Sequence, residues 1–210
     1  VLFLVYLDRL PCGWSIQLVN INKGTMMKII SYSSAALWLS LTLLSSTPSA
    51  KSLAHIERAI NQVQPQGTGR LNFWGFHIYD VTLYRSAGKD SAEFALDIKY
   101  QKSFSGAAIA SRTADEMKNM GVSEAQSAIW GKELATVLPN IESGQTLTGV
   151  YSPKQGTTFF YDGKKIAQFP GADFSKAFFG IWLDSKTSVP KLRSELLGNG
   201  CPPPLITGAC

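Results

Sequence analysis

Few side chains in this 210-residue sequence have the type and spacing to do chemistry, and most lie between residues 70 and 112. Arg70 follows a Gly-x-Gly segment and enters a strand-like run, where its guanidinium could hold an anionic oxygen or a carboxylate. The alternative is an ordinary exposed charge at a strand end. His77 and Tyr79 lie on the apolar parity of the same run, so both are predicted to point inward. His77 is then either a core histidine bonded to a neighbour or a direct ligand contact, haem ligation included.

Two further positions are candidate ligand contacts. Tyr100 ends a strand on its buried parity, where its hydroxyl needs a partner and could meet a ligand. Arg112 directly precedes a predicted helix start and is either an anion contact or an exposed charge. His55, by contrast, is expected at the surface of a short first helix.

Signatures of metal, nucleotide and triad chemistry are absent from the sequence after residue 50. That part has two histidines and no Cys-x-x-Cys, His-Glu-x-x-His, Gly-x-x-x-x-Gly-Lys or Gly-x-Ser-x-Gly segment. We therefore expect no metal site and, apart from the haem alternative, no cofactor. In the same part 12 Lys and 5 Arg oppose 14 acidic residues, a net charge of +3 without a basic block, so nucleic acid is not an expected partner.

The first half of this part supplies the elements that must position the candidates. Helical spacing of apolar residues from Leu53 to Val63 predicts a short helix that ends before Pro65, followed by a turn at 66–69. Residues 71–84 read as a strand pair or one bent strand, with Gly75 as the bend. Residues 92–100 alternate cleanly, which predicts a strand with one buried and one wet face.

The second half predicts helices and short strands. Capping pairs open helices at Thr113, with Glu116, and at Ser123, with Gln126. Three strands follow at 146–151, 157–161 and 165–169, the last two joined by an Asp162-Gly163 turn, and then helices begin at Asp173 and near Pro190. The Phe174, Phe178, Trp182 stripe on the Asp173 helix is expected in the core. The fold class is α+β: a mostly antiparallel sheet with a layer of helices on one face and a ligand cleft between the layers.

The N-terminal residues read as export sequence rather than as part of this fold. Residues 26–50 run from a short basic start through about ten apolar residues to a small-residue exit, the order of a signal peptide and about half the length of a membrane span. Cleavage is expected after Ala50 or Ala54. Residues 1–25 are interpreted as translated upstream sequence, with a genuine extension as the alternative. We therefore expect one domain at residues 51–198 in a periplasmic or secreted protein, with no membrane span after cleavage.

Residues 199–210 form a tail rich in cysteine and proline. Cys201 and Cys210 are the ends of a ten-residue segment that contains three prolines, and export would let a disulfide between them persist. The alternative is two free thiols on a frayed end. Nothing in the sequence indicates an oligomeric state.

The order of several short motifs is similar to that of a known family. Gly-x-Gly-Arg is followed by Phe-His-Ile-Tyr-Asp-Val-Thr-Leu-Tyr, the alternating strand to Tyr100, an Arg-Thr helix, a Phe-Tyr-Asp-Gly hairpin and Phe-Phe-Gly-Ile-Trp-Leu, with a closing Leu-Leu-Gly. Across residues 65–198 this resembles the chalcone isomerase-like proteins of bacteria. The resemblance implies an open-faced β-sandwich and, in the plant enzymes, closure of a flavanone ring by a phenolate that attacks an enone.

Only part of the plant site carries over. The substrate-holding arginine of the family falls on Arg70, and a Ser or Thr of its late helix on Ser175. Its threonine falls near His77, its tyrosine near Phe104 or Ser105 and its asparagine near Arg112. Because oxyanion donors each contribute strongly to rate, the resemblance implies little isomerase activity.

These observations favour an exported, noncatalytic protein that binds a small hydrophobic or amphipathic acid, as other members of the wider fold family bind fatty acids or haem. The expected ligand contacts are Arg70, His77, Tyr79, Tyr100, Arg112 and Ser175. An intramolecular lyase acting on a chalcone-like enone, with Arg70 and His77 as catalytic candidates, is the first alternative. Haem binding is the second.

Overall fold

The computed structural model describes residues 53–88 and 91–206 of the chain. The chain divides into two units, Val1–Thr47 and Pro48–Cys210, and every described residue belongs to the second. The predicted upstream sequence and signal peptide therefore lie outside the described residues. No helix in the described ranges is long and apolar enough to cross a membrane.

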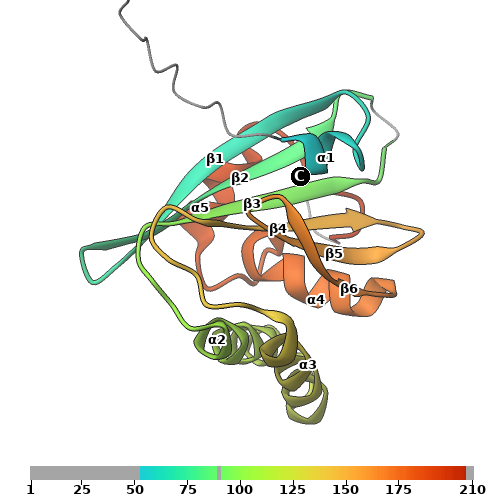
Figure 1. Cartoon of the computed structure of the whole chain (residues 1–210). Coiled ribbons are helices and arrows are strands. Elements are labelled where there is room, and N and C mark those ends of the chain that lie inside the picture. The colour runs from blue at the N-terminus through green and yellow to red at the C-terminus, as the bar shows by residue number, and fades with distance from the viewer. Residues whose placement is uncertain (1–52, 89–90, 207–210) are drawn as a thin grey trace, which may run out of the picture. The chain divides into compact units, whose positions relative to one another are not determined.

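The described unit is one six-stranded antiparallel sheet with helices on both faces (Figure 1). Its elements are α1 (Ala54–Glu57), β1 (Val63–Phe73), β2 (Phe76–Ser86), β3 (Phe94–Tyr100), α2 (Gly106–Asn119), α3 (Glu124–Val137), β4 (Thr146–Ser152), β5 (Gly156–Tyr161), β6 (Lys164–Phe169), α4 (Ala172–Leu183) and α5 (Pro190–Leu197). The strands follow one another as a meander, β1 to β6, and each pairs antiparallel with the next. The predicted α+β class is confirmed.

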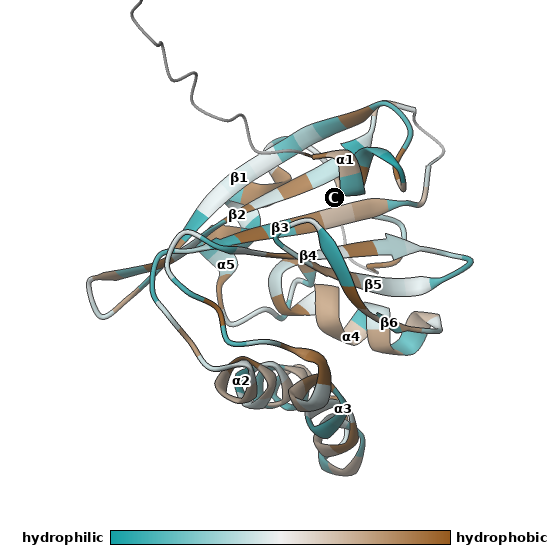
Figure 2. Ribbon diagram, viewed as in Figure 1, coloured by the Kyte–Doolittle hydropathy of each residue, from teal (hydrophilic) through white to brown (hydrophobic). Residues whose placement is uncertain are grey.

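The four longer helices cover one face of the sheet. α5 packs on β1 and β2, α4 packs on β5, and the α2–α3 pair adjoins α4. The main core lies between this layer and the inward side chains of β2 to β5. Figure 2 shows β3 and α4 as hydrophobic elements, in keeping with their position at the centre of the molecule's core. The stripe of Phe174, Phe178 and Trp182 lies in this core, as predicted.

α1 covers the other face, which the sequence predicts to be wet along β3. Ala95 and Asp97 are both buried, because α1 and the segment after it pack Ile56 and Ile60 against Ala95 and Val150. Strand periodicity predicts which residues share a face of the sheet, but it does not predict which other elements cover that face. The prediction of a wet face is therefore wrong for most of β3.

β1 begins earlier than expected and runs through the predicted turn at 66–69. Val63 already pairs with Ser86, so the first helix ends at Glu57 rather than continuing to Pro65. Pro65 is tolerated because β1 is an edge strand with a bulge after that residue. Gly67 and Gly69 allow α5 to pack closely against β1. A Cβ on Gly67 would lie 2.4 Å from the carbonyl oxygen of Glu195 in α5.

The strand pair around Gly75 is confirmed as a hairpin. Trp74 and Gly75 form its two-residue turn with φ values of 51° and 80°. The Asp162-Gly163 turn, the Ser123 cap and Pro190 at the start of α5 are likewise as predicted.

Two helix starts differ from the prediction. α2 begins at Gly106, where the Ser105 side chain accepts a hydrogen bond from the backbone N–H of Ala108. Thr113 lies inside the helix, where its hydroxyl donates to the Ile109 carbonyl. α4 follows Gly171, and Asp173 lies in its first turn. A Ser, Thr or Asp near a helix start satisfies local rules at several positions, and the register is decided by packing.

The start of the tail is folded onto the domain rather than frayed. Ile206 is buried in the main core, and the Gln66 side chain donates to the Cys201 carbonyl oxygen over 3.1 Å. Cys201 is disulfide-bonded. The predicted partner, Cys210, lies outside the described residues, so the pairing itself stays a prediction.

Candidate functional site

An apolar pocket of about 640 Å³ lies between the helix-covered face of the sheet and helices α2 and α4. Its walls are mostly aliphatic and aromatic side chains, among them Ile78, Tyr100, Ile109, Leu147, Phe178 and Trp182. Its volume falls within the range of roughly 300–1,000 Å³ typical of small-molecule sites. The expected cleft between sheet and helices is therefore present.

α2 supplies one wall of the apolar pocket through its helical spacing. Ile109, Arg112, Thr113 and Glu116 recur every three or four residues and line the pocket together. The Ser105 cap sets this register, because it makes the helix begin at Gly106 rather than at Thr113.

Four polar side chains of the lining lie close to one another, and we call the group formed by Tyr79, Arg112, Glu116 and Ser188 the polar cluster of the pocket. Glu116 forms an ion pair with Arg112 and accepts a hydrogen bond of 2.8 Å from the Ser188 hydroxyl. Glu116 is buried, whereas the Arg112 side chain is 69% exposed. The guanidinium has five N–H donors, so the ion pair leaves donors that can reach a ligand.

Tyr79 and Tyr100 are the phenols of the apolar pocket. The Trp182 indole N–H donates to the Tyr79 hydroxyl over 2.8 Å. Desolvation by burial raises the pKa of Tyr79 to about 12, and the nearby Glu116 carboxylate acts in the same direction. Burial also raises the pKa of Tyr100. Both groups therefore stay protonated at neutral pH and are neutral hydrogen-bonding groups rather than bases.

Arg70 and His77 do not line the apolar pocket, contrary to expectation. Leu71 pairs with Tyr79 but Asn72 pairs with His77, so Ile78 is an extra residue in β2, a β-bulge. One inserted residue reverses the alternation of side chains, which moves His77 to the opposite face from Tyr79. Arg70 is directly opposite Asp80 in the ladder and also lies on that other face.

Arg70 and His77 meet at Asp80 instead. The Asp80 carboxylate accepts a hydrogen bond of 2.9 Å from Arg70 Nε, and the same oxygen lies 3.0 Å from His77 Nε2. The Gln101 side chain donates a hydrogen bond to the second oxygen of Asp80. Desolvation by burial would raise the pKa of Asp80, but the bonds with Arg70 and His77 outweigh it and hold that pKa below its usual value. The pair predicted to anchor a ligand is thus engaged in a surface network.

The remaining predicted contacts divide between two locations. Tyr79, Tyr100 and Arg112 line the apolar pocket. Ser175 does not: it is buried in α4, where it receives a hydrogen bond from Thr157 and donates to the Gly171 carbonyl.

Glu116 and Ser188 were not expected in a site. The sequence pattern assigned Glu116 to a capping pair with Thr113, although its spacing of four from Arg112 is the signal of a helical ion pair. For Ser188, a helix-start residue by sequence, no local signal indicated a contact 72 residues away in the chain.

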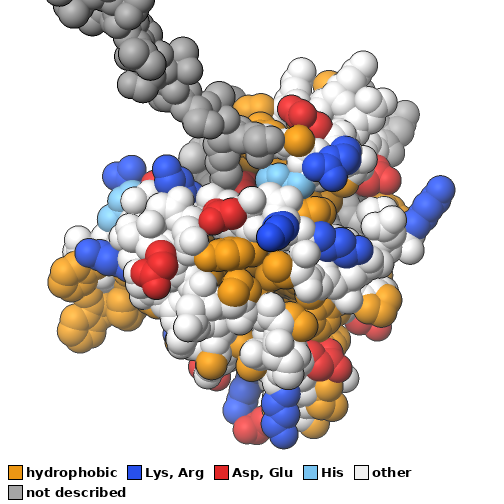
Figure 3. Space-filling view, viewed as in Figure 1, with side chains coloured by type: hydrophobic (Ala, Val, Ile, Leu, Met, Phe, Trp, Pro, Cys, Tyr) orange, Lys and Arg blue, Asp and Glu red, His pale blue; other side chains and the backbone are white. Residues whose placement is uncertain are grey.

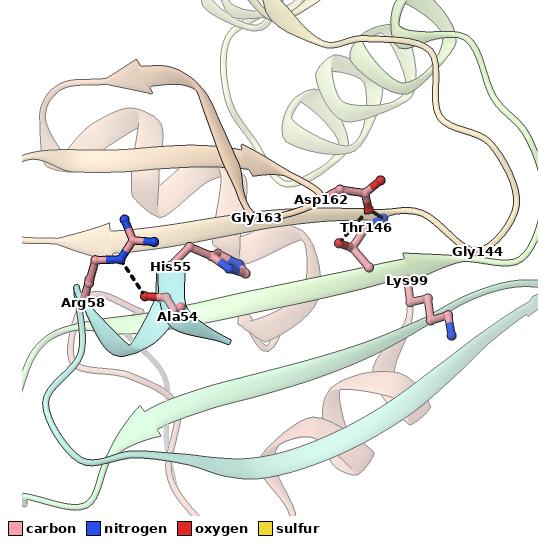
Figure 4. A pocket seen from close by; sticks show the side chains of 8 residues that line it. All are labelled: Ala54, His55, Arg58, Lys99, Gly144, Thr146, Asp162 and Gly163. Carbon is pink, nitrogen blue, oxygen red and sulfur yellow. Dashed lines mark hydrogen bonds between the residues drawn. The ribbon is translucent and has the colours of Figure 1, made fainter. Parts of the chain in front are cut away.

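A second, more polar pocket of about 430 Å³ lies on the α1 side of the sheet (Figure 4). Its lining comprises Ala54, His55, Arg58, Lys99, Gly144, Thr146, Asp162 and Gly163. In Figure 4, Arg58 and Lys99 lie at opposite sides of this pocket and do not converge on one point. The Asp162 carboxylate is engaged with the backbone N–H and hydroxyl of Thr146.

His55, expected at the surface, is only 4% exposed in this second pocket. Its Nε2 lies 3.1 Å from the hydroxyl of Thr148, which donates to the Asp97 carboxylate over 2.7 Å. Because α1 folds onto the sheet, a histidine close to the predicted cleavage site becomes part of a buried polar chain. The prediction of a surface histidine is wrong.

The donor set of the apolar pocket suits an organic ligand better than a metal or haem. Among the residues that the structure describes, no His, Cys or Met side chain lines it, and Glu116 is its one carboxylate. Within the described ranges, no group of three or more His, Cys, Asp or Glu residues is placed to hold a metal ion. His77, on which haem ligation depended, lies outside the apolar pocket and does not fit that role.

Comparison with known proteins gives three findings. A family model described as chalcone isomerase-like matches residues 54–198. An uncharacterized protein of Haemophilus influenzae is 27% identical over 138 residues, which are 64% of this chain and 68% of the relative. The crystal structure of an Arabidopsis thaliana fatty-acid binding protein matches with a TM-score of 0.54 and 8% identity, covering 67% of this chain and 90% of that one. At this identity the last likeness shows the fold alone.

Proposed function

The chain belongs to the chalcone isomerase-like family, as its motif order predicted, and we propose that it is a noncatalytic binding protein for a small hydrophobic or amphipathic acid. The observation that carries the proposal is the apolar pocket, whose lining is mostly apolar and includes one cluster of charged and hydroxyl groups. An amphipathic acid has the same division, an apolar body and a polar head. The fold neighbour described as a fatty-acid binding protein supports this ligand class.

The polar head is proposed to bind at Arg112 rather than at Arg70. Arg112 is the one cation among the described residues of the pocket lining, and most of its side chain is accessible. A carboxylate there would share the guanidinium with Glu116, and the hydroxyls of Tyr100 and Ser188 lie in the same lining. Within the described residues no hydrogen bond reaches the Tyr100 hydroxyl, which leaves it available to a ligand.

An intramolecular lyase has less support. The positions that the family resemblance assigns to substrate holding and to the oxyanion fall on Arg70 and near His77, and both lie outside the apolar pocket. The phenols that do line it stay protonated, because burial raises the pKa of each. Ligand binding requires none of these catalytic groups.

Export is part of the proposal. The basic start, apolar run and small-residue exit of residues 26–50 support secretion, and the domain would then act in the periplasm or outside the cell. Fusion of residues 26–50 to a reporter that is active only after export tests this point. A reporter that stays inactive would contradict it.

The binding proposal is tested with cis-parinaric acid, whose fluorescence increases in apolar sites. Ala108 is exposed on α2 and lines the apolar pocket, so Ala108→Phe should fill the entrance and weaken binding at least about tenfold, or 1.4 kcal/mol. Ala107 is its exposed neighbour and does not line the pocket, so Ala107→Phe is the matched control and should bind as the wild type does.

Equal binding by wild type and Ala108→Phe would contradict the proposed site. Solvent extraction and mass spectrometry of the purified protein should identify the acid it carries. A Soret band in its absorption spectrum would instead favour haem, and turnover of a chalcone would favour the lyase.

A further inference from the structure

The tip of the β1–β2 hairpin, residues 73–76, exposes three large aromatic side chains. Phe73, Trp74 and Phe76 are 61%, 86% and 63% exposed, and Phe73 and Trp74 stack with ring centroids 6.0 Å apart. Figure 3 shows hydrophobic side chains gathered where this hairpin ends. Ile129 in α3 is the other large apolar side chain of comparable exposure in the described residues, and it lies apart from this tip.

The hairpin tip extends beyond the rest of the sheet. β3 pairs with β2 only as far as Tyr79, opposite Tyr100, and one further bond joins Gln101 to Ile78. Residues 72–77 are therefore a two-stranded ribbon without a third strand, and Figure 1 shows this ribbon projecting from the sheet. Because the ribbon protrudes, its tip can insert into a surface outside the protein without any displacement of the core.

The turn residue Trp74 is unfavourable for local folding. Its φ of 51° lies in the left-handed region, where a bulky side chain is rare. A two-residue turn of this kind favours Asn or Asp before Gly. A tryptophan that is both strained and exposed stabilises neither the turn nor the core, which indicates a role outside the folded domain.

A lysine lies beside the hairpin tip. Lys102 lies over the Phe76 ring, with Nζ 5.9 Å from the centroid. Farther along the ribbon, Arg70 and the adjacent His77 are balanced by Asp80. Aromatic residues next to a lysine are the composition typical of a surface that enters the headgroup region of a bilayer.

The same ribbon reaches the apolar pocket. Leu71, Asn72 and Phe73 line that pocket, so Phe73 belongs both to the pocket wall and to the exposed tip. Phe73 therefore lies where the exposed tip and the pocket lining meet.

We propose that the hairpin tip docks this protein on a lipid bilayer, with Trp74 and Phe76 inserted among the headgroups and Lys102 facing anionic lipid. Docking does not depend on what the apolar pocket binds. Exchange of a lipid-derived acid between bilayer and pocket is a consequence that rests on the proposed function.

Cosedimentation with vesicles of phosphatidylcholine and phosphatidylglycerol tests the docking. The full chain is used throughout, so residues outside the described ranges contribute equally to every variant. Trp74→Asn with Phe76→Thr replaces the aromatics by residues suited to a turn and a strand, so the fold is retained. This double variant should partition at least about tenfold less, because two aromatic side chains no longer leave water on insertion.

Ile129→Ser removes an exposed apolar side chain elsewhere and should partition as the wild type does. A second readout locates the insertion: lipids brominated near the headgroup should quench wild-type fluorescence more than that of Trp74→Phe. Neither Trp74 nor Phe76 lines the apolar pocket, so the double variant should still bind cis-parinaric acid.

Unchanged partitioning of the double variant, or quenching that does not depend on Trp74, would overturn the proposal. Sedimentation that shows a dimer lost in the double variant would assign the tip to self-association instead. A failure of cis-parinaric acid binding in the wild type would contradict the proposed function and leave the docking result standing.

Discussion

Arg112 and Glu116 show how one ion pair sets the charge of an otherwise apolar pocket. The two residues lie one helical turn apart on α2, with the glutamate buried and the arginine mostly exposed. As a pair they are neutral, so a bound carboxylate is attracted by the arginine and repelled by the glutamate. In the proposed complex with an acid, affinity should therefore depend on Glu116 as much as on Arg112.

This balance predicts opposite effects for two substitutions. Arg112→Gln should weaken oleate binding about 10- to 100-fold, since a hydrogen bond to a charged group contributes about 1.5–3 kcal/mol. Glu116→Gln should strengthen it, because the competing carboxylate is removed. Oleyl alcohol, which has no charge, is the control ligand and should respond to neither change by more than about twofold. Equal effects on oleate and oleyl alcohol, measured by displacement of cis-parinaric acid, would place the head group elsewhere.

The buried phenols predict a loss of stability at high pH. Unfolded tyrosine ionises near pH 10, whereas burial raises the pKa of Tyr79 to about 12 and that of Tyr100 also upward. Above about pH 10 the unfolded state therefore releases protons that the folded state retains, and the free energy of unfolding falls until the folded pKa is reached. Below about pH 10 these groups should make no contribution to pH dependence.

Urea unfolding between pH 9 and 12 measures this decrease, which should amount to about 2–3 kcal/mol for Tyr79. Tyr100→Phe removes one of the two phenols without leaving a known donor unpaired, so its stability should fall less steeply. A parallel pH profile for Tyr100→Phe and wild type would contradict the assignment.

Among the elements, α5 depends on the glycines of β1. The helix crosses the strand so closely that a Cβ on Gly67 would lie 2.4 Å from the carbonyl oxygens of Glu195 and Leu196, and one on Gly69 would lie 2.5 Å from Leu192 Cδ1. The backbone of α5 cannot move aside without losing Leu192 and Leu196 from the core. The Gly-x-Gly segment is thus a helix-packing site, not a ligand-binding turn.

Gly67→Ala should destabilise the domain by about 1–3 kcal/mol, the usual cost of overpacking. Gly88→Ala is the matched control, because a Cβ there would meet only the Ser86 hydroxyl at 3.5 Å and should change stability by less than about 0.5 kcal/mol. Thermal unfolding of both variants is the measurement. A Gly67→Ala protein as stable as the control would show that α5 is not held against β1 in this way.

At the scale of the whole molecule, helices cover both faces of the sheet, and a pocket lies between the sheet and the helices on each face. The long helices leave the apolar pocket, and α1 leaves the smaller polar one. A ligand that binds only the folded domain stabilises it, and one that fills an apolar pocket also adds packing contacts. Ligand binding should therefore stabilise the entire domain.

Oleate at about 100 times its dissociation constant should raise the free energy of unfolding by about 2.7 kcal/mol. Thermal unfolding with increasing oleate measures this effect, and the shift should be absent in Ala108→Phe. The same shift in Ala108→Phe would indicate adsorption of oleate elsewhere on the protein.

Local patterns in the sequence predicted much of the architecture. Alternation along β3, the Asp162-Gly163 turn and the apolar stripe of α4 each depend on residues close together in the chain, so periodicity and turn chemistry suffice to predict them. The order of these elements also indicated the family and the α+β class. Three of the predicted contacts do line the pocket: Tyr79, Tyr100 and Arg112. Strand alternation places the two tyrosines on the pocket face of the sheet, and the register of α2 places Arg112 there.

Only the tertiary structure decided which face each candidate occupies. One extra residue, Ile78, reverses the alternation of side chains in β2 and moves His77 away from the apolar pocket. The isoleucine side chain gives no local signal that predicts a bulge at this position. Packing of α1 buries His55, and packing of α5 explains Gly67. The last two outcomes depend on contacts between residues far apart in the chain, where the free energy of packing outweighs local preference.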